Sequence, residues 1–390
     1  MIETDSGKRA DPEGDGGDGT GGVKLDLAGL AQRHGIPAIS GVVASAKEVL
    51  WTGTAGAARE DSIFRIFSMT KPVTSVAAMQ LVEERKLELD EPASRWLPEL
   101  GKLEVLEGFD AAGRPRLRAA KKAVTVRHLL THTSGFGYEF TSAEILRYWE
   151  VTGEGGMADR QKGVLNSPLL FEPGERWQYG VSTDWLGKLV EAVSGLALGE
   201  YMKRHIFEPL GMTETGFHVE PQKWGRLVMN YAREADGRLK EAPFGAPKAR
   251  AFESGGGGLL GTAQDYTKFV QMLLNGGGEV LQRETVEEMG RNQVGRLAAG
   301  RLKTSMPQYS LDADFHPGHD DGWGLGLLIN ETAYEHGRSA GSLGWAGVAN
   351  TFFWVDRQKG IAGVLLMQVL PFFDGPCIAA LRAFERAVYG

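Results

Sequence analysis

Ser68 and Lys71 lie three positions apart at the start of a segment with helical periodicity. Apolar residues recur at helical spacing through 69–87, and Pro72 falls in the first turn, where a helix tolerates proline. This spacing places the serine hydroxyl and the lysine amine on one helix face, near the positive N-terminal end. An unassisted serine is a poor nucleophile at neutral pH, and a partly desolvated lysine can have a pKa low enough to activate it. The pair therefore indicates nucleophilic catalysis by Ser68.

Four further short motifs follow this Ser-x-x-Lys along the chain. They are Leu-Leu-Thr-His-Thr-Ser-Gly at 129–135, Phe-Glu-Pro-Gly at 171–174, Tyr-Gly-Val-Ser at 179–182 and Ser-Gly-Gly-Gly-Gly at 254–258. Over most of residues 25–388 the chain thereby resembles serine β-lactamases, penicillin-binding proteins and their esterase relatives, which show the motifs in this order. The resemblance implies an α+β, β-lactamase-like fold with an antiparallel sheet flanked by helices and an inserted helical lobe.

The resemblance also implies that Tyr179 completes the catalytic group. In such enzymes a tyrosine or serine from the helical lobe reaches the serine and the lysine, and Tyr179 follows Pro173-Gly174 at the matching place. Tyr179 and Lys71 would then deprotonate Ser68, protonate the leaving alkoxide and help to activate the deacylating water. Which of the two is the formal base stays open, because coupled groups titrate as a unit.

The third motif of these enzymes departs from the usual pattern. β-Lactamases and peptidases carry Lys-Thr-Gly or His-Thr-Gly on the strand beside the cleft, whereas the aligned residues here are Trp345-Ala346-Gly347. Trp345 would offer an apolar, stacking surface in place of a positive charge for a substrate carboxylate. The same substitution is characteristic of the family VIII carboxylesterases, with which the chain is identified by resemblance. Gly347 would let the backbone approach closely, and the N–H groups of Val348 and Ser68 would form the oxyanion hole.

These features predict a carboxylesterase that hydrolyses neutral, short-chain acyl esters through a Ser68 acyl-enzyme, without a metal or an organic cofactor. Val181 stands where many β-lactamases have asparagine, so a side-chain amide for gripping a β-lactam is missing. The alternatives on the same fold are a β-lactamase or D-amino-acid peptidase, an acyltransferase and an amidase. A non-catalytic binding module is disfavoured because the serine, the lysine and the tyrosine are all present.

A second serine matches a different catalytic motif. Gly-Arg-Ser-Ala-Gly at 337–341 has the pattern of a nucleophile elbow centred on Ser339. Such an elbow needs a strand directly before the serine and a helix directly after it, but here a glycine-rich turn leads into a strand. Ser339 is therefore a weaker candidate than Ser68.

Metal and phosphate sites are also disfavoured. His128 with His132 lacks the glutamate of a zinc protease motif, and the histidines and aspartates of 316–321 have no evident third ligand, so capping and loop hydrogen bonds are expected. The glycines of 255–258 are not followed by Gly-Lys-Ser or Gly-Lys-Thr. They predict a tight turn, and Thr262 after them predicts a helix N-cap.

The elements that must position these residues come from both ends of the chain. Strand-like stretches at 36–46 and 48–56 indicate a hairpin, and strand character returns late, at 322–330, 348–355 and 361–369. A final helix follows at 378–388. This order predicts one antiparallel sheet assembled from both termini.

The domain boundaries follow from the same pattern. We expect an α/β domain formed by 23–85 and 255–390 and a mainly helical domain at 86–254, after a disordered acidic tail at 1–22. Short helices are expected in the middle domain at 126–130, 185–193 and 198–206. The cleft between the two lobes is then the expected site.

Composition limits the partners. The chain has 390 residues, 42% hydrophobic and 24% charged, so it can bury a large core. A formal net charge of -7 without a basic stripe argues against a nucleic-acid partner. Cys377 is the only cysteine, and the longest strongly apolar stretch, 361–370, is about half the length of a membrane-spanning helix. With no secretory signal visible, we expect a cytoplasmic protein with no membrane partner and a small-molecule ester substrate, whose oligomeric state is unknown.

Overall fold

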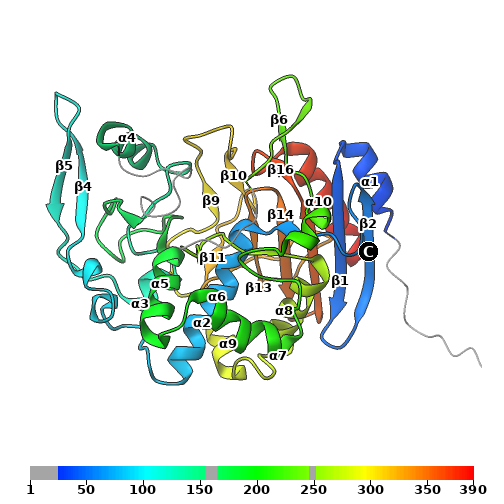
Figure 1. Ribbon diagram of the computed structural model, residues 1–390, viewed down its shortest axis with the longest axis horizontal. Coiled ribbons are helices and arrows are strands. Elements are labelled where there is room, and N and C mark those ends of the chain that lie inside the picture. The colour runs from blue at the N-terminus through cyan, green and yellow to red at the C-terminus, as the bar shows by residue number, and fades with distance from the viewer. Residues whose placement is uncertain (1–24, 154–164, 246–251) are drawn as a thin grey trace, which may run out of the picture.

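The computed structural model describes residues 25–153, 165–245 and 252–390. The acidic tail predicted at 1–22 lies outside the described residues. A seven-stranded sheet forms one lobe, and helices with an outlying hairpin form the other (Figure 1).

The large sheet combines strands from both ends of the chain. Its strand order is β11-β12-β13-β14-β15-β1-β2, and every neighbouring pair is antiparallel. The bounds are β1 (Ala38–Ser45), β2 (Val49–Gly56), β11 (Gly322–Trp323), β12 (Leu328–Asn330), β13 (Ser342–Gly347), β14 (Thr351–Asp356) and β15 (Ile361–Met367). Ile39 of β1 lies opposite Met367 of β15, so the blue N-terminal hairpin adds to the orange C-terminal strands in Figure 1. The predicted antiparallel sheet built from both termini is confirmed.

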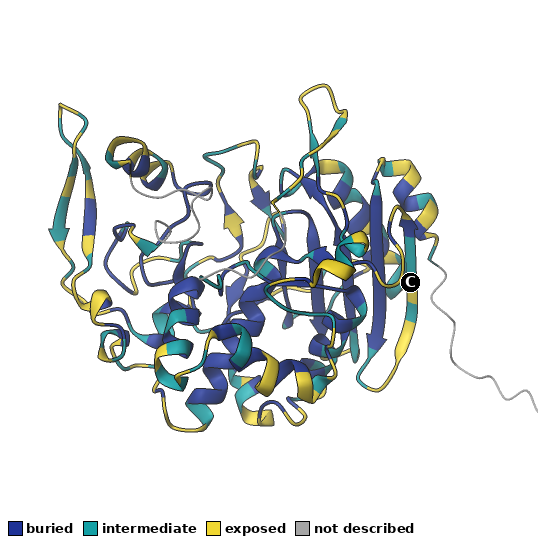
Figure 2. Ribbon diagram, viewed as in Figure 1, coloured by how far each residue is buried: buried dark blue, intermediate teal, exposed yellow. Residues whose placement is uncertain are grey.

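Helices cover both faces of this sheet. Phe353 of β14 contacts Tyr266 of α8 (Ala263–Leu274), with ring centroids 5.3 Å apart. The next residue, Trp354, contacts Phe384 of α10 (Gly375–Tyr389) at 5.7 Å. Because successive strand residues point to opposite faces, α8 and α10 lie on opposite sides of the sheet. The strands between them are almost entirely buried, as the dark blue ribbon in Figure 2 shows.

Helix α2 (Thr70–Glu83) begins directly after Ser68 and runs through the centre of the molecule. Every residue from 70 to 81 is buried. Its sequence is apolar or small on all sides, which is typical of a helix that packs on every face. The helix ends at Glu83, before the predicted boundary at 87. Arg85, two positions later, adopts a left-handed backbone with φ +57. No helix in the described ranges, α2 included, is long and apolar enough to cross a membrane.

The second lobe packs against α2 through α5 and α6. Besides α2, α8 and α10, the α-helices of the described residues are α1 (Leu27–His34), α3 (Val126–Leu130), α4 (Ala143–Thr152), α5 (Ser182–Ser194), α6 (Leu198–Met202), α7 (Glu208–Leu210) and α9 (Arg283–Met289). Helix α5 contacts α2 and α3. The helices predicted at 126–130, 185–193 and 198–206 are therefore present, although the last one continues as a π-helical turn over Lys203–Phe207.

Two hairpins in this middle segment were not predicted from the sequence. They are β4 (Glu104–Phe109) with β5 (Pro115–Ala119), and β6 (Tyr231–Arg233) with β7 (Leu239–Glu241). The first hairpin stands at the end of the molecule farthest from the large sheet (Figure 1). Charged pairs hold it in part, since Arg118 bonds to Glu107 at 2.9 Å and to the buried Glu172. Apolar packing contributes as well, because Leu106 and Leu117 lie in a small hydrophobic cluster with α4. Such a hairpin gives little strand signal in the sequence.

The late strands are shorter than predicted because glycines and turns interrupt them. The stretch 322–330 forms two strands, β11 and β12, joined by a turn in which Gly326 has φ +94. A Cβ at Gly326 would overlap the Ser75 hydroxyl of α2, so this turn passes very close to the helix. The other short strands are β3 (Phe64–Arg65), β8 (Leu260–Gly261), β9 (Arg301–Leu302), β10 (Ala313–Asp314) and β16 (Val369–Leu370).

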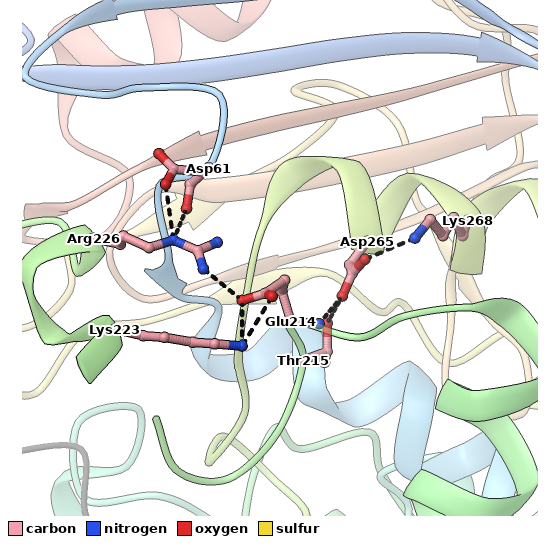
Figure 3. A network of polar contacts seen from close by, with 7 residues as sticks. All are labelled: Asp61, Glu214, Thr215, Lys223, Arg226, Asp265 and Lys268. Atoms are coloured by element: carbon pink, nitrogen blue, oxygen red, sulfur yellow. Dashed lines mark hydrogen bonds and ion pairs between the residues drawn. The ribbon is translucent and has the colours of Figure 1, made fainter. Parts of the chain in front are cut away.

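A network of charged side chains ties the connection before α8 to that helix (Figure 3). Glu214 accepts hydrogen bonds from Lys223 at 2.9 Å and from Arg226 at 2.8 Å. Asp265, in the first turn of α8, accepts from the Glu214 N–H at 2.7 Å. The Thr262 hydroxyl in turn accepts from the Asp265 N–H at 3.1 Å, which confirms the predicted N-cap.

We expect Leu366→Ala to lower the free energy of unfolding by about 2–5 kcal/mol, because Leu366 on β15 is fully buried and alanine would leave a cavity. The matched control is Leu50→Ala on β2, whose side chain is 42% exposed and whose loss should cost within about 0.5 kcal/mol. Urea unfolding followed by tryptophan fluorescence measures both. Equal losses in the two variants would contradict the assignment of the sheet interior.

Candidate active site

Ser68 lies in a single 3-10 turn, Phe67–Met69, directly before α2. Phe67 has φ +46, in the left-handed region that side-chain-bearing residues rarely adopt. The backbone is held on both sides, since the Met69 N–H donates to the Ile66 carbonyl at 3.1 Å and the Ile66 N–H donates to Leu259 at 3.2 Å. Residues held in this region cluster at functional sites, because the surrounding structure must impose the conformation. The position of Ser68 is therefore set by its neighbours.

Lys71 is completely buried one turn along from Ser68. Its Nζ lies 3.2 Å from Ser68 Oγ, 3.2 Å from the Tyr138 hydroxyl oxygen and 2.7 Å from the Gly256 carbonyl oxygen. The structure thus places the serine and the lysine on one face, as their spacing predicts. The 254–258 run is a tight turn, also as predicted, and it presents a carbonyl to the lysine.

Tyr179 comes from the other lobe, shortly before α5, and lies against this pair. Lys71 Nζ is 4.6 Å from the centre of the Tyr179 ring. Burial raises the pKa of the Tyr179 phenol above its ordinary value, although hydrogen bonds with Ser68 and Trp345 act in the opposite direction. The phenol is therefore protonated at neutral pH and is able to donate a proton. The three residues predicted to be catalytic lie together.

Two residues that the sequence analysis did not single out complete the cluster. The Tyr138 hydroxyl donates to Asp184 Oδ2 at 3.1 Å. The other oxygen of Asp184 accepts from the Ser254 hydroxyl at 2.5 Å and from the Gly256 N–H at 3.1 Å. Asp184 is 2% exposed. A buried carboxylate with three donors therefore stands directly behind the group that contacts Lys71.

In the sequence, only the positions of Tyr138 and Asp184 near two of the motifs could have pointed to them. Tyr138 comes three positions after the motif at 129–135, and Asp184 comes two positions after the motif at 179–182. An aspartate in the first turn of a helix is ordinarily explained by the helix dipole. Its contact with a tyrosine 46 residues away depends on the packing of the whole lobe.

A pocket opens beside Ser68 with an empty space of about 490 Å³, part of it continuous with solvent. Aromatic and small residues from both lobes line it: Phe67, Ser68, Tyr138, Phe140, Asp184, Phe252, Ser254, Gly256, Gly257 and Val348. Val348, predicted to contact substrate, is among them. Such a wall, mostly apolar with a few polar groups near the nucleophile, is typical of a small-molecule site.

Trp345 and Gly347 lie on β13 and act through neighbouring residues. Trp345 is only 3% exposed, and its ring centroid lies 5.1 Å from that of Tyr179. Part of the apolar surface that the sequence predicts for Trp345 is therefore covered by Tyr179. A Cβ at Gly347 would overlap the Ile66 carbonyl oxygen and the Thr351 hydroxyl, so the predicted close backbone approach is present.

Ser339 lies in the loop before β13. Its N–H donates to Asp356 Oδ2 at 2.8 Å, and its carbonyl accepts from the Asn330 amide at 2.8 Å. A loop leads into a strand here, as expected, and this is not the geometry of a nucleophile elbow.

The histidine patterns form no metal site among the described residues, where no group of three or more candidate ligands gathers. His128 forms a capping box with Thr125 at the start of α3, which confirms its predicted capping role. Burial, with a smaller effect from Lys71, lowers the pKa of His132 well below its ordinary value. His316 Nδ1 faces Asp321 Oδ1 at 3.5 Å.

A serine before a buried helix, a lysine one turn along and a tyrosine from a second lobe together define a class of serine enzymes that act on acyl groups. The chain belongs to the beta-lactamase family, whose sequence model matches residues 24–386. This confirms the resemblance to the serine β-lactamase superfamily and the predicted α+β fold.

The relatives include both transferases and an esterase. Monacolin J acid methylbutanoyltransferase of Aspergillus terreus is 34% identical over 349 residues, which cover 84% of this chain and 82% of the relative. Lovastatin esterase of Penicillium rubens is 30% identical over 359 residues, covering 89% and 90%. The unliganded structure of simvastatin synthase (LovD) from Aspergillus terreus, 30% identical, superposes with a TM-score of 0.81 over 93% of this chain and 96% of that one.

We expect Gly347→Ala to lower kcat/KM for an activated ester by about 10–100-fold, because the new methyl group would push β13 away from the segment that carries Ser68. Gly225→Ala is the matched control, since a Cβ there meets no atom within 4 Å. Steady-state kinetics of the two variants measures the effect. Wild-type activity in Gly347→Ala would show that this close approach does not position the nucleophile.

Proposed function

We propose that the protein is a carboxylesterase that hydrolyses neutral acyl esters through an acyl-enzyme on Ser68. The observation that carries the proposal is the 3.2 Å separation between the buried Lys71 Nζ and Ser68 Oγ. A buried amine at this distance can take the serine proton without a third group between them. The similarity to an esterase over nine tenths of both chains supports the same chemistry.

Acylation follows from the positions of the three side chains. Ser68 Oγ forms a bond to the ester carbonyl carbon as its proton passes to the Lys71 and Tyr179 pair. The bond to the alkoxide then breaks, and the alkoxide takes a proton from the phenol of Tyr179, which burial keeps protonated. The protonated Lys71 can restore the phenol proton. The products of this half-reaction are the alcohol and the Ser68 ester.

Deacylation repeats these steps with water as the nucleophile. The same pair accepts a proton from the attacking water, and Ser68 leaves with a proton when its ester bond breaks. We assign the oxyanion hole to the N–H groups of Ser68 and Val348, which belong to residues that line the pocket. One such donor contributes about 3–4 kcal/mol to transition-state stabilisation.

The acyl specificity is proposed from the pocket walls. The β13 motif carries tryptophan and glycine, and the described part of the pocket lining includes Phe67, Phe140 and Phe252 but no lysine, arginine or histidine. An uncharged acyl group suits such walls better than a substrate with a carboxylate.

Ser68→Ala should lose at least about 1,000-fold in kcat/KM on p-nitrophenyl esters from acetate to octanoate, because the covalent intermediate cannot form. Ser339→Ala is the matched control and should remain within about twofold of wild type. A fluorophosphonate probe, read by mass spectrometry of the peptides, should label Ser68. Labelling of Ser339, or full activity in Ser68→Ala, would contradict the proposal.

Acyl transfer to an alcohol is a second candidate function. The similarity to a methylbutanoyltransferase and to simvastatin synthase over most of this chain favours it. Transfer and hydrolysis share the Ser68 ester and differ only in the hydroxyl compound that removes the acyl group. The enzyme would be a transferase where an alcohol occupies the pocket in place of the deacylating water.

Product partitioning separates the two functions. With p-nitrophenyl butyrate as donor and 1-butanol as acceptor, hydrolysis predicts butyric acid as the main product at every acceptor concentration. Transfer predicts that butyl butyrate replaces it as butanol rises, while p-nitrophenol release is maintained. Gas chromatography quantifies both products, and Ser68→Ala should form neither.

A further inference from the structure

Asp184 fixes the direction of the hydrogen bond between Tyr138 and Lys71. A carboxylate accepts hydrogen bonds and has none to give, so the single hydroxyl hydrogen of Tyr138 points to Asp184 Oδ2, 3.1 Å away. The Tyr138 oxygen therefore acts as an acceptor towards Lys71 Nζ at 3.2 Å. The Gly256 carbonyl, 2.7 Å from the same nitrogen, is an acceptor by nature.

These two acceptors orient the lysine nitrogen. A neutral amine has two hydrogens and one lone pair, and the hydrogens point to Tyr138 and Gly256. The lone pair is then left on the side of Ser68 Oγ, 3.2 Å away. We propose that Asp184 and Tyr138 form a positioning pair that holds Lys71 with its lone pair towards Ser68, so that Lys71 is the base and Tyr179 the acid. The inference rests on the proposed function and assigns the separate roles of its proton-transfer groups.

The proton balance is consistent with this assignment. The Ser68 proton moves to Lys71 Nζ as Oγ bonds to the acyl carbon, and the resulting ammonium donates to Ser68, Tyr138 and Gly256. Tyr179 keeps its own proton until the alkoxide leaves, because burial raises the pKa of the phenol. Asp184 neither gains nor loses a proton in the cycle, so its role is to position.

Three other described residues around Lys71, namely Tyr138, Asp184 and His132, do not compete for the base role. The ring centroid of Tyr138 lies 5.1 Å from Lys71 Nζ. The ring centroid of Tyr179, a residue in the loop before α5, lies 4.6 Å from the same nitrogen. Asp184 contributes the negative charge of the cluster from α5. Burial lowers the pKa of His132 well below its ordinary value, so its ring is neutral.

The Asp184→Asn variant tests the direction of the hydrogen bond. The Gly256 N–H can only donate, so it selects the amide oxygen of the new asparagine, whose NH₂ group then faces Tyr138. Tyr138 becomes an acceptor from the asparagine and turns its hydrogen to the Lys71 lone pair. We expect kcat/KM for p-nitrophenyl butyrate to fall about 100-fold, within the range of general base catalysis.

The double variant Tyr138→Phe/Asp184→Asn gives the distinguishing readout. Tyr138→Phe alone removes one acceptor and should cost about tenfold, since Gly256 still holds the amine. In the double variant there is no Tyr138 hydroxyl, so Asp184→Asn cannot turn a hydroxyl hydrogen towards the Lys71 lone pair. The double variant should therefore have a kcat/KM at least about threefold higher than that of Asp184→Asn. A double variant as slow as Asp184→Asn, or slower, overturns the inference.

The pH profile gives an independent readout. Asparagine removes a negative charge near Lys71, which disfavours the ammonium form relative to the amine. In Asp184→Asn, the rise of kcat/KM on the acidic side of the pH profile should therefore occur at lower pH, although the maximum kcat/KM is smaller than in the wild type. Asp265→Asn, which changes a buried carboxylate in the network of Figure 3, should leave this rise in place. An unmoved rise in Asp184→Asn counts against the pair.

Folding and the parent function are controlled separately. Thermal melting establishes whether each variant is folded. If Asp184→Asn is not folded, Tyr138→Phe becomes the test variant, and Tyr201→Phe, which changes another buried tyrosine, is its control. Wild-type activity in Tyr138→Phe then overturns the inference. If the wild-type enzyme turns over esters with Ser68 labelled while the variants stay within about threefold, only this inference fails. If the wild type has no ester turnover, the proposed function itself fails.

Discussion

The buried amine of Lys71 is the constraint on which the rest of the structure depends. A nitrogen with donor hydrogens in the protein interior is strongly destabilising unless acceptors surround it. Here its hydrogen-bonding partners come from three separate places: Ser68 on the turn before α2, and the acceptors Tyr138 after α3 and Gly256 in the turn before α8. Each segment must lie within hydrogen-bond distance of one atom. The packing of both lobes is therefore tied to the geometry of the nucleophile.

The same constraint explains where rigidity is concentrated. Ser68 follows a phenylalanine in the left-handed region, and α2 is buried on every side behind it. Trp345 packs against Tyr179 and thereby limits the movement of the phenol. Asp184 links the helical lobe to the 254–258 turn through two donors. Packing and hydrogen bonds from outside the Ser68, Lys71 and Tyr179 group thus hold the reacting side chains in register.

Much of the fold and of the catalytic group was predictable from the sequence, because both depend on local patterns. The spacing of Ser68 and Lys71 alone places them on one face, and β1, β2 and α10 follow from their apolar periodicity and turn residues. The Tyr138 and Asp184 contact was not predictable, since it joins residues whose proximity depends on the packing of α3 against α5. Hairpin β4–β5 escaped for a different reason, because its apolar residues, such as Leu106 and Leu117, are few and are interspersed with charged ones.

The order in which a ribosome delivers the strands gives the sheet topology a further consequence. Strand β1 has one hydrogen-bonded edge against β2, but its other edge pairs with β15, whose residues 361–367 are synthesised more than 300 positions later. Until then the nascent chain presents an unpaired, apolar strand edge, which is prone to association with other chains. The nucleophile segment at 67–69 precedes β13, which packs beside it, by more than 270 positions. Neither the central sheet nor the catalytic cleft can therefore close until β13 and β15 have left the ribosome.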